Sequence, residues 1–486
     1  MVLIEKLVDL EKSEEKIYRI KKAKEDFFFF CKHYLPDAFP TEFAEYQKIL
    51  IEIIQKRKIT KQQIEQLKKF IKPDYHTYLR EIDYIEGILD AEPRDHGKTT
   101  RMTQAFPLWL AVTQKNVFPV IIGASLEMAA DSFLDSIRYE IENNERIKED
   151  FGELKGRIWK RNKIILKNGN AIGAVGSRGS IRGIKDRYRR PTHIICDDLL
   201  KEDEVESKKE REKLYIWFKR TVMNLGKGAL IIIVNTIMHP ADLISRLFDE
   251  VKEGQLEKWV GIRLRAIRPD GKPLWPQRWN IKALEQKRKE LGSIAFSTEW
   301  LNEPLEEGSK KFRREWFKYF DLSDIDWTKL HRVMAVDPAT GKETGDYSAI
   351  VVVGKKEGEV YVLYADGWKI SDLEFIRKII DVYKTWKPHE IRFETITFQE
   401  IYKNDLLREA MKEGIMLPVK GVNNMQSKEF RISKLSPLVE GGIIKFRKEQ
   451  KLLLDQLDNF PKDNDDLPDA LEMAIRKEPE PRIRWM

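Results

Sequence analysis

Gly97, Lys98 and Thr99 have the residue types and spacing best suited to binding a phosphate. They follow a largely apolar run at residues 84–89 and precede a helix-like segment, which predicts a strand, a tight turn and a helix start. In such a turn the backbone N–H groups face the anion, Lys98 reaches the terminal phosphates and the Thr99 hydroxyl ligates Mg²⁺. Alone, the tripeptide is most often a chance turn, and Glu92 stands where the pattern has its first glycine.

A pair of acidic residues about 100 positions later offers the second half of a nucleotide-hydrolysing site. The apolar residues 194–196 end in Asp197 and Asp198, as expected of a buried strand that delivers carboxylates to its end. Nucleotide hydrolysis needs one carboxylate to hold Mg²⁺ and another to position the attacking water. We assign these tasks to Asp197 and Asp198. The alternative, a strand that ends in a solvated acidic turn, loses weight because Lys98 lies upstream.

Other residues are candidates for contacting the nucleotide. Thr236 follows the apolar run 229–234 and could sense the γ-phosphate, although a threonine at a strand end is also common. Arg178 and Arg182 lie in a loop rich in glycine and serine, and could stabilise the transferring phosphate. The same arginines could instead touch DNA phosphates. Gln47 could bond adenine, although an isolated glutamine on a helix is usually solvated.

Four carboxylates in the last third of the sequence could hold metal ions. Asp337 directly follows one predicted strand, Glu394 ends another, and Asp466 and Asp469 lie one helical turn apart. Such a set can bind two divalent cations about 4 Å apart, one activating water and one stabilising the leaving oxygen. Each acid alone could serve a turn, an ion pair or a helix N-terminus. Their order favours a nuclease, and it leaves open which of Asp465, Asp466 and Asp469 binds metal.

Hydrophobic periodicity indicates the elements that must position these residues. Residues 1–82 are predicted to be helical and to pack on residues 83–265, where short strands alternate with helices as in a parallel α/β sheet. Residues 266–330, rich in proline, tryptophan and charge, are interpreted as a lid or connector. Residues 331–478 have three strands, a helix, a strand and further helices, which is the order of an RNase H-like domain. Residues 479–486 form a tail.

The expected elements can be stated as ranges. The strands are predicted at 117–123, 163–166, 171–175, 193–196, 229–234, 331–336, 349–353, 360–364 and 390–394. The C-terminal helices are predicted at 371–385, 397–412, 427–439, 449–458 and 467–476.

Composition sets broad limits on the protein. With 486 residues the chain exceeds what one core organises, and its net charge of +8 permits a polyanionic partner without requiring one. Cys31 and Cys196 stand alone, which predicts a reducing compartment and no zinc site. No apolar run approaches the ~18 residues of a membrane span, and the N-terminus has no signal-peptide pattern. We therefore predict a cytoplasmic protein with no membrane contact.

Taken together, these residues resemble the large terminase subunit of tailed bacteriophages. Residues 93–99 look like the family's deviant P-loop, residues 194–198 like its Walker B strand, and residues 274–279 like its link between motor and nuclease. Asp337, Glu394, Asp466 and Asp469 match its nuclease acids in order. This chain departs from many members in having Asp198 where they have glutamate, which puts the water-positioning role of Asp198 in doubt.

The resemblance implies an α/β chain in which an ASCE-like P-loop NTPase with a parallel sheet precedes an RNase H-like nuclease with a mixed sheet. ATP and Mg²⁺ would bind the first domain, and two Mg²⁺ or Mn²⁺ ions the second. Hydrolysis would drive double-stranded DNA into a prohead, and the nuclease would cut the concatemeric genome. The residues expected to contact the nucleotide in the P-loop are Arg94, Asp95, His96, Gly97, Lys98, Thr99 and Thr100.

The resemblance also implies partners. A small terminase subunit and a portal protein would join a homo-oligomeric ring of this chain on the prohead, in the cytoplasm of a bacterial host, and the free chain could be monomeric. Within the ring, Arg182 or Arg178 would complete the ATP site of a neighbour. The rival interpretations are a helicase-nuclease of DNA repair or defence, and a non-catalytic DNA-binding protein with vestigial sites.

Glu92 raises a question of its own, because a carboxylate beside a triphosphate repels it. We expect Glu92 either to point away from the phosphates or to pair with a base such as Arg101. On this basis the substitution Glu92→Gly is predicted to be tolerated.

Overall fold

An eight-stranded sheet forms the centre of the N-terminal part of the chain in the computed structural model. Its strand order is β3-β4-β5-β2-β6-β7-β1-β8, in which all neighbours are parallel except the antiparallel pairs β3–β4 and β4–β5 at one edge. The strands are β1 (Gly87–Ala91), β2 (Pro119–Gly123), β3 (Lys155–Lys160), β4 (Lys163–Leu166), β5 (Ala171–Gly176), β6 (His193–Asp197), β7 (Leu230–Asn235) and β8 (Trp259–Arg263).

The structure describes residues 2–179, 184–186, 188–200, 202–226, 228–305, 309–338, 347–394, 397–424 and 426–476. The chain divides into two units. The first comprises Met1–Lys287 and Phe296–Leu305, and the second Arg288–Ala295 and Glu306–Met486.

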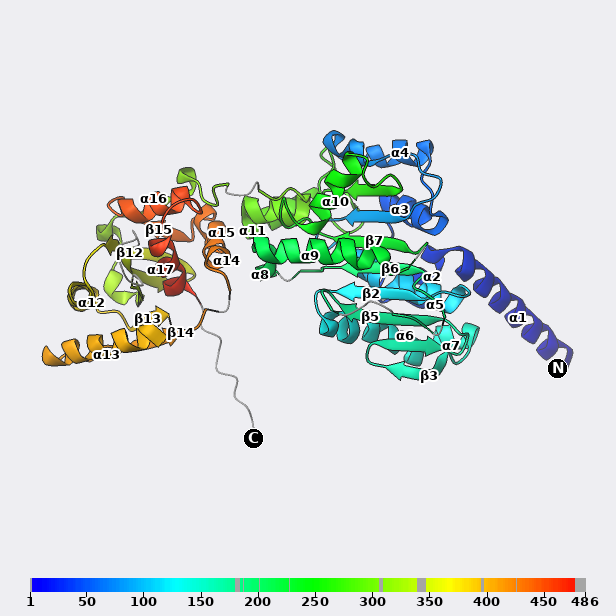
Figure 1. Cartoon of the computed structure of the whole chain (residues 1–486), viewed down its shortest axis with the longest axis horizontal. Helices are drawn as coiled ribbons and strands as arrows, with labels where there is room; N and C mark the ends of the chain where they lie inside the picture. The colour runs from blue at the N-terminus through cyan, green and yellow to red at the C-terminus, as the bar shows by residue number, and fades with distance from the viewer. Residues whose placement is uncertain are drawn as a thin grey trace. The chain divides into compact units, whose positions relative to one another are not determined.

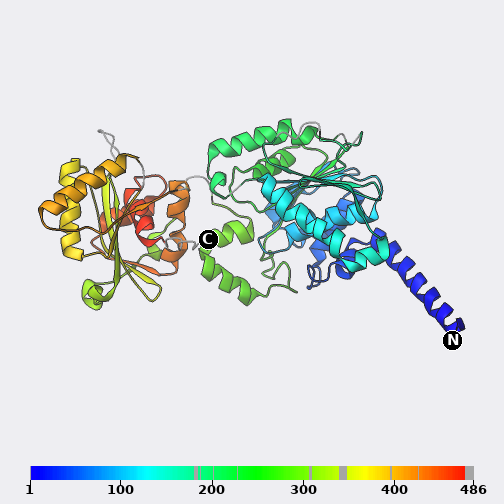
Figure 2. The ribbon, with the colours of Figure 1, turned by 90° about the horizontal axis from the view of Figure 1, so that it is seen from below.

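Helices cover both faces of the first sheet, as Figures 1 and 2 show. The central strands are buried on both sides, which is why their sequences are continuous apolar runs rather than alternating ones. Phe27, Phe30 and Leu50 of the N-terminal helices share one core with Ile88 and Ile232 of the sheet. The helices of this unit are α1 (Val2–Glu25), α2 (Phe27–Tyr34), α3 (Glu45–Lys56), α4 (Lys61–Lys68), α5 (Phe106–Thr113), α6 (Asp135–Asn143), α7 (Glu145–Phe151), α8 (Glu202–Val205), α9 (Lys208–Arg220), α10 (Leu243–Lys252) and α11 (Ile281–Leu301), and its 3-10 turns are η1 (Pro73–Tyr78) and η4 (Val222–Asn224). Both ends of α11 belong to this unit, whereas its residues Arg288–Ala295 are grouped with the second.

A second, mixed sheet forms the centre of the C-terminal unit, in the order β14-β13-β10-β11-β12-β15-β9. Strands β10, β11 and β12 are consecutive and antiparallel, whereas β13 lies parallel to β10. The strands are β9 (Lys318–Tyr319), β10 (His331–Asp337), β11 (Ser348–Lys356), β12 (Glu359–Trp368), β13 (Glu390–Glu394), β14 (Val419–Val422) and β15 (Ile444–Phe446). The helices are α12 (Asp372–Trp386), α13 (Thr397–Lys412), α14 (Lys428–Ser433), α15 (Ser436–Glu440), α16 (Lys451–Asn459) and α17 (Asp466–Ile475), and the short 3-10 turns are η5 (Arg314–Trp316), η6 (Leu322–Asp324) and η7 (Trp327–Lys329).

Alternation along β10 assigns its side chains to the two faces of this sheet. Val333 and Ala335 pack in one apolar cluster with residues of α17. Met334 and Val336 pack in the other cluster, with residues of α12. Because side chains alternate in a strand, Asp337 lies on the α17 face.

The predicted architecture is confirmed, since the chain has a mainly parallel α/β sheet followed by a mixed sheet. All ten predicted strands, including the one predicted at residues 84–89, are present, with small shifts at their ends. Strands β3, β8, β9, β14 and β15 were not predicted; β3 and β9 are largely exposed edge strands, and β9 and β15 are too short to show a periodicity.

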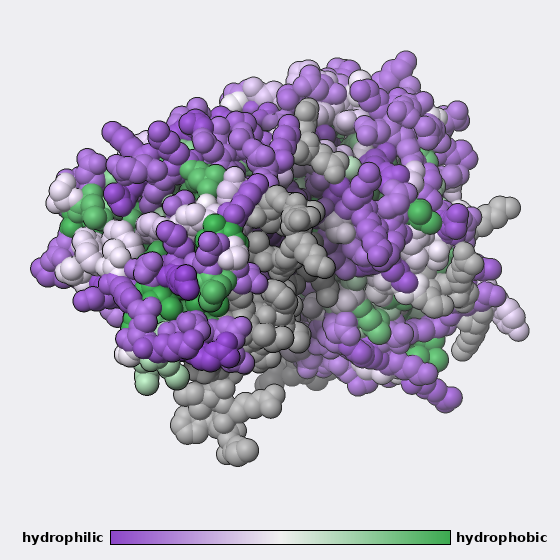
Figure 3. Space-filling model, turned by 60° about the vertical axis from the view of Figure 1, so that its left-hand side comes forward, coloured by the Kyte–Doolittle hydropathy of each residue, from purple (hydrophilic) through white to green (hydrophobic). Residues whose placement is uncertain are grey.

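The surface in Figure 3 is mainly hydrophilic, and apolar residues occur on it in small separate groups. Within the described part of the chain, no helix is both long and apolar enough to cross a membrane. The tail predicted at 479–486 lies outside the described residues.

Candidate active sites

The phosphate-binding stretch lies at the carboxyl end of β1, as predicted. The chain turns with Gly97 at φ 72° and continues through Lys98 into the π-helical segment η2 (Thr99–Ala105). A left-handed φ favours glycine, because a β-carbon is strained there. Strand β7 separates β1 from β6, so the carboxyl ends of three parallel strands bring the loop, Asp197 and Thr236 to one edge of the sheet.

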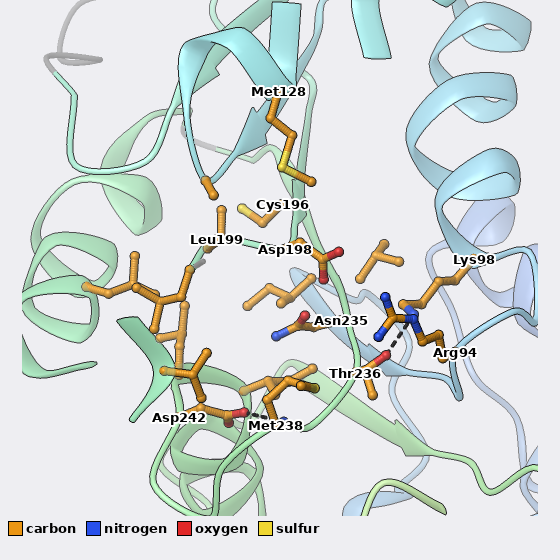
Figure 4. A pocket seen from close by; sticks show the side chains of 18 of the residues that line it. Arg94, Lys98, Met128, Cys196, Asp198, Leu199, Asn235, Thr236, Met238 and Asp242 are labelled. Carbon is orange, nitrogen blue, oxygen red and sulfur yellow. Dashed lines mark hydrogen bonds between the residues drawn. The ribbon is translucent and has the colours of Figure 1, made fainter. Parts of the chain in front are cut away.

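Lys98 reaches across this edge to the end of β7. Its Nζ donates to Thr236 Oγ1 over 2.7 Å, and both side chains are buried. Lys98, Thr236 and Asp198 line one cavity of about 300 Å³. Figure 4 shows Lys98, from the loop after β1, and Asp198, directly after β6, both facing this cavity.

Asp197 ends β6 and is fully buried. Thr103 Oγ1, from η2, donates to its Oδ2 over 2.5 Å, while Oδ1 is buried with no hydrogen-bond partner in the protein. Burial and the charge of Asp198 raise the pKa of Asp197 to about 7, against the opposing effect of the Thr103 hydroxyl. A buried carboxylate oxygen without a partner suits a hard cation such as Mg²⁺, so this residue fits its predicted role.

Asp198 follows with φ 43°, a left-handed conformation that aspartate tolerates better than most residues. The sharp turn separates the two neighbouring carboxylates, because Asp197 stays buried in the sheet while Asp198 lines the cavity. The pair therefore has the arrangement expected of one metal ligand and one residue that faces the attacking water.

The remaining loop residues have different surroundings. Arg94 pairs with Glu299 (Nη1 to Oε2, 2.8 Å) while its side chain stays half-exposed. His96 is fully buried against Trp300, and burial lowers its pKa to about 4. Only the backbone of His96 is thus available to a phosphate. Asp95 and Thr100 line a second cavity of about 300 Å³ beside the loop.

Gln47 also lines this second cavity, together with Phe39 and Trp275. Its amide is already engaged, since Nε2 donates to the His96 carbonyl over 3.2 Å and Oε1 accepts from the backbone of Ala44 over 3.0 Å. Gln47 therefore ties α3 to the phosphate-binding loop. An adenine contact by this residue remains a prediction and requires it to exchange one of these bonds.

Glu92 pairs with Arg101, which was one of the two arrangements expected from the sequence. Both side chains are buried, and Tyr46 Oη donates to the other Glu92 oxygen over 2.8 Å. Asp90 lies beside them with its nearest oxygen 3.8 Å from Arg101, and burial raises its pKa well above the ordinary range. The predicted tolerance of Glu92→Gly does not follow from this arrangement, because the substitution leaves Arg101 buried without its charged partner.

Of the two candidate finger arginines, Arg178 is described and Arg182 lies outside the described residues. Arg178 pairs with Glu204 (2.7 Å) and with Glu210, both from the α8–α9 segment. To reach a phosphate it has to leave these carboxylates.

The nuclease acids converge because of strand register. Val336 of β10 pairs with Phe393 of β13, so Asp337 and Glu394 follow side by side at the carboxyl ends of parallel strands. Arg392, two residues before Glu394, donates to the Met473 carbonyl of α17, which places this face of β13 under α17. Asp337 and Glu394 therefore face the helix that carries the other two acids.

Asp466 and Asp469 lie in the first turn of α17, and both are buried. Asp466 Oδ2 accepts from the backbone of Tyr347 over 3.0 Å. Asp469 is held by the guanidinium of Arg431, which donates to both of its oxygens and, over 3.1 Å, to Glu472. Asp469 is consequently the least available of the four acids for a metal.

Lys428 is an unpredicted member of this cluster. Its Nζ lies 4.0 Å from Asp337 Oδ2, 3.5 Å from Asp466 Oδ1 and 2.7 Å from Asp465 Oδ1. Burial raises the pKa of Asp337 to about 8 although Lys428 opposes the shift, and Asp469, Asp466 and Glu394 add to it. The acids thus repel one another, and a cation relieves the repulsion.

The donor set suits hard divalent cations, since it consists of carboxylate oxygens. Among the residues that the structure describes, however, no three acidic, histidine or cysteine side chains lie close enough together to hold a metal ion. The acids instead surround Lys428. Asp346, a further carboxylate shortly before β11 in the sequence, lies outside the described residues.

The sequence-based reasoning missed Lys428, Arg431 and Thr103. Lys428 and Arg431 are one turn apart on α14, which is the same spacing as that of Asp466 and Asp469. This matching spacing could be seen in the sequence, but nothing in the sequence indicated that the two helices contact each other. Thr103 lies four residues after Thr99, which was a weak signal for a second hydroxyl near the acidic strand.

Comparisons with known proteins agree with this geometry. Residues 334–478 match the family of terminase RNaseH-like domains. A large terminase from a thermophilic bacteriophage superimposes with a TM-score of 0.53 at 12% identity, covering 89% of this chain and 98% of that one. The chain has the fold of a large terminase. The resemblance predicted from the sequence is therefore confirmed.

A second structure of the same thermophilic-phage large terminase, in complex with ATP-gamma-S, has a TM-score of 0.51 at 12% identity, again covering 89% of this chain and 98% of that one. No curated protein sequence matches this chain. At these identities the likeness to the large-terminase structures concerns the fold, and the roles of individual residues stay predictions.

Proposed function

We propose that this chain is the motor and nuclease of viral DNA packaging, in which ATP hydrolysis moves double-stranded DNA into a prohead and a two-metal endonuclease cuts the concatemeric genome. One observation carries the proposal. The chain has a large-terminase fold in which Lys98, Asp198 and Thr236 line one cavity, and in which Asp337 and Glu394, at the ends of two strands of the second sheet, face Asp466 of α17.

In the site around Lys98 and Asp198, each residue has a separate role in ATP hydrolysis. The Lys98 ammonium, now on Thr236, offsets the negative charge of the β- and γ-phosphates when ATP is present. Asp197 and Thr99 hold Mg²⁺, which supplies further charge neutralisation. Asp198 orients the attacking water and accepts its proton, and the hydroxyl of Thr103 keeps Asp197 in place.

In the second site Asp337, Glu394 and Asp466 hold the divalent cations, Mg²⁺ or Mn²⁺, that activate water and stabilise the leaving oxygen. Asp469, which Arg431 holds in place, contributes its negative charge to this site. The function of this site is the hydrolysis of a phosphodiester of duplex DNA.

The assembly follows from the same proposal. Copies of the chain form a ring on the prohead in the cytoplasm of a bacterial host, joined by a small terminase subunit and a portal protein. Arg178 or Arg182 enters the ATP site of a neighbour. For Arg178 this requires the release of Glu204 and Glu210, which hold it here.

The direct test uses the purified full chain in two assays side by side, Mg²⁺-dependent ATP hydrolysis and Mn²⁺-dependent plasmid cleavage. Both activities are expected. A chain with neither activity but with salt-sensitive DNA binding would favour the non-catalytic alternative.

The helicase-nuclease alternative differs in what happens to the duplex. A forked DNA substrate with one labelled strand distinguishes the two, because a packaging motor moves along the duplex without separating its strands. ATP-dependent release of the labelled strand would contradict the packaging proposal.

A further inference from the structure

Lys428 is a cation placed among the acids of the nuclease site. Its Nζ lies within 4.0 Å of four carboxylates, namely those of Asp337 (4.0 Å), Asp465 (2.7 Å), Asp466 (3.5 Å) and Asp469 (3.9 Å). Only the Asp465 contact has hydrogen-bonding length. Lys428 therefore acts on the other three acids mainly through its charge.

The position of Lys428 in its helix is locally unfavourable. It is the first residue of α14, whose N-terminus is capped by Ser427 Oγ accepting from the backbone of Phe430. A helix N-terminus carries a partial positive charge and therefore disfavours a lysine. The acids of α17 and β10 compensate for this placement, so the lysine is best explained by the cluster it faces.

Arg431 fixes α14 in this position. It lies one turn after Lys428, is buried, and bonds both oxygens of Asp469. A guanidinium that binds a carboxylate through two parallel bonds is a fixed partner, whereas an ammonium on a flexible stem is a point charge that moves easily. About a third of the Lys428 side chain is exposed, at 36%. Arg431 is thus the anchor and Lys428 the exchangeable group.

Lys428 and a divalent cation compete for the same oxygens. The described acids surround the ammonium and do not approach one another closely enough to form a metal site. We propose that Lys428 is a displaceable counter-cation that occupies the nuclease site until a divalent cation enters, and thereby raises the metal concentration that the nuclease requires. This inference rests on the proposed nuclease function of the same acids.

Calorimetric titration of the nucleotide-free full chain with Mn²⁺ tests the inference without measuring cleavage. The variant Lys428→Met removes the competing charge, and we expect it to bind Mn²⁺ about tenfold more tightly than the wild type, as estimated from one nearby charge in a partly screened site. Lys434→Met, at the C-cap of the same helix, is the matched control with unchanged affinity, because Lys434 bonds Gln426 rather than the acids. Asp337→Asn is expected to abolish Mn²⁺ binding, which would show that the measured heat comes from the site that contains Asp337.

Thermal unfolding supplies a second readout. In EDTA, Lys428→Met is expected to melt below the wild type, since the acids lose their only counter-cation apart from Arg431 among the described contacts, and saturating Mn²⁺ is expected to close the gap. If Lys428→Met does not fold, Lys428→Gln, which keeps a polar group of similar length, takes its place.

An affinity for Mn²⁺ that is unchanged or weaker in the variant would overturn the inference while leaving a metal-binding wild-type nuclease intact. The proposed nuclease function itself would be overturned if neither the wild type nor the Lys428→Met variant bound Mn²⁺ or cut plasmid. Binding by the variant alone would support the inference most strongly.

Discussion

The ATPase and nuclease clusters both contain a buried carboxyl whose pKa is raised, to about 7 for Asp197 and to about 8 for Asp337, yet the protein stabilises them differently. Asp197 accepts a hydrogen bond from the neutral hydroxyl of Thr103, whereas Lys98 is hydrogen-bonded to Thr236 and acts on Asp197 through its charge. Asp337 instead faces the charged Lys428.

This difference in the partners of Asp197 and Asp337 indicates how each site would bind its metal ion. At the ATPase site one oxygen of Asp197 has no hydrogen-bond partner in the protein, so no ion pair of Asp197 has to break when a cation arrives with the nucleotide. At the nuclease site a cation of the protein has to leave first. If the proposed function holds, one chain combines an ATPase site that binds its metal without breaking an ion pair with a nuclease site in which Lys428 opposes metal binding.

The largest expected effect concerns the nuclease half of this comparison. Asp337→Asn removes a charge that the metal requires, and plasmid cleavage is expected to fall about a thousandfold, equivalent to about 4 kcal/mol. ATP hydrolysis should not change, because Asp337 belongs to the other unit. Cleavage that persists at the wild-type rate would remove Asp337 from the site.

The next effect concerns stability in the ATPase half. Glu92→Gly leaves the buried Arg101 without its charged partner and is expected to cost about 3–5 kcal/mol of unfolding free energy. Denaturant unfolding followed by tryptophan fluorescence measures it. Glu86→Gly, which removes an exposed pair with Lys258, is the control and should change little. A Glu92→Gly variant as stable as this control would restore the expectation of tolerance.

A smaller effect tests the hydroxyl that supports Asp197. Thr103→Val removes its hydrogen bond, and the Mg²⁺ concentration needed for half-maximal ATP hydrolysis is expected to rise about tenfold, within the usual range for a group that orients a metal ligand. Thr103→Ser keeps the hydroxyl and is expected to rescue the activity. Equal behaviour of the valine and serine variants would show that the bond has no role.

The smallest effect is on pH dependence. The folded chain protonates His96 only near pH 4, whereas the unfolded chain does so near 6.5, so stability falls as the pH drops below about 6.5. Between pH 7 and 5.5 this group contributes a loss on the order of 1 kcal/mol. His96→Phe should reduce the pH slope of the melting temperature, while His193, whose pKa burial also lowers to about 4, retains its own contribution. An unchanged slope would mean that His96 is accessible to protons.

Much of this arrangement was predictable because it depends on local pattern. Alternation in β10 and the register with β13 bring Asp337 and Glu394 together, and continuous apolar strands bring Lys98 and Asp197 to one sheet edge. Such features need only strand periodicity and the rule that parallel strands end at the same edge.

The rest depends on how helices dock. Lys428 enters the acid cluster because α14 packs against α17 through Arg431 and Asp469, and no periodicity in either helix indicates that contact. In the same way, Gln47 bonds the His96 carbonyl because α3 docks beside the phosphate-binding loop. Side chains whose role is set by tertiary contact, rather than by position in an element, were those missed or assigned another task.

The most direct test of the central claim, two separate hydrolytic sites on one chain, is the variant Lys98→Ala measured in both assays. ATP turnover is expected to disappear, because the ammonium that faces the phosphates is lost, while Mn²⁺-dependent plasmid cleavage continues at the wild-type rate. Lys115→Ala, an exposed lysine, should leave both activities unchanged. Normal ATP hydrolysis by Lys98→Ala would contradict the account.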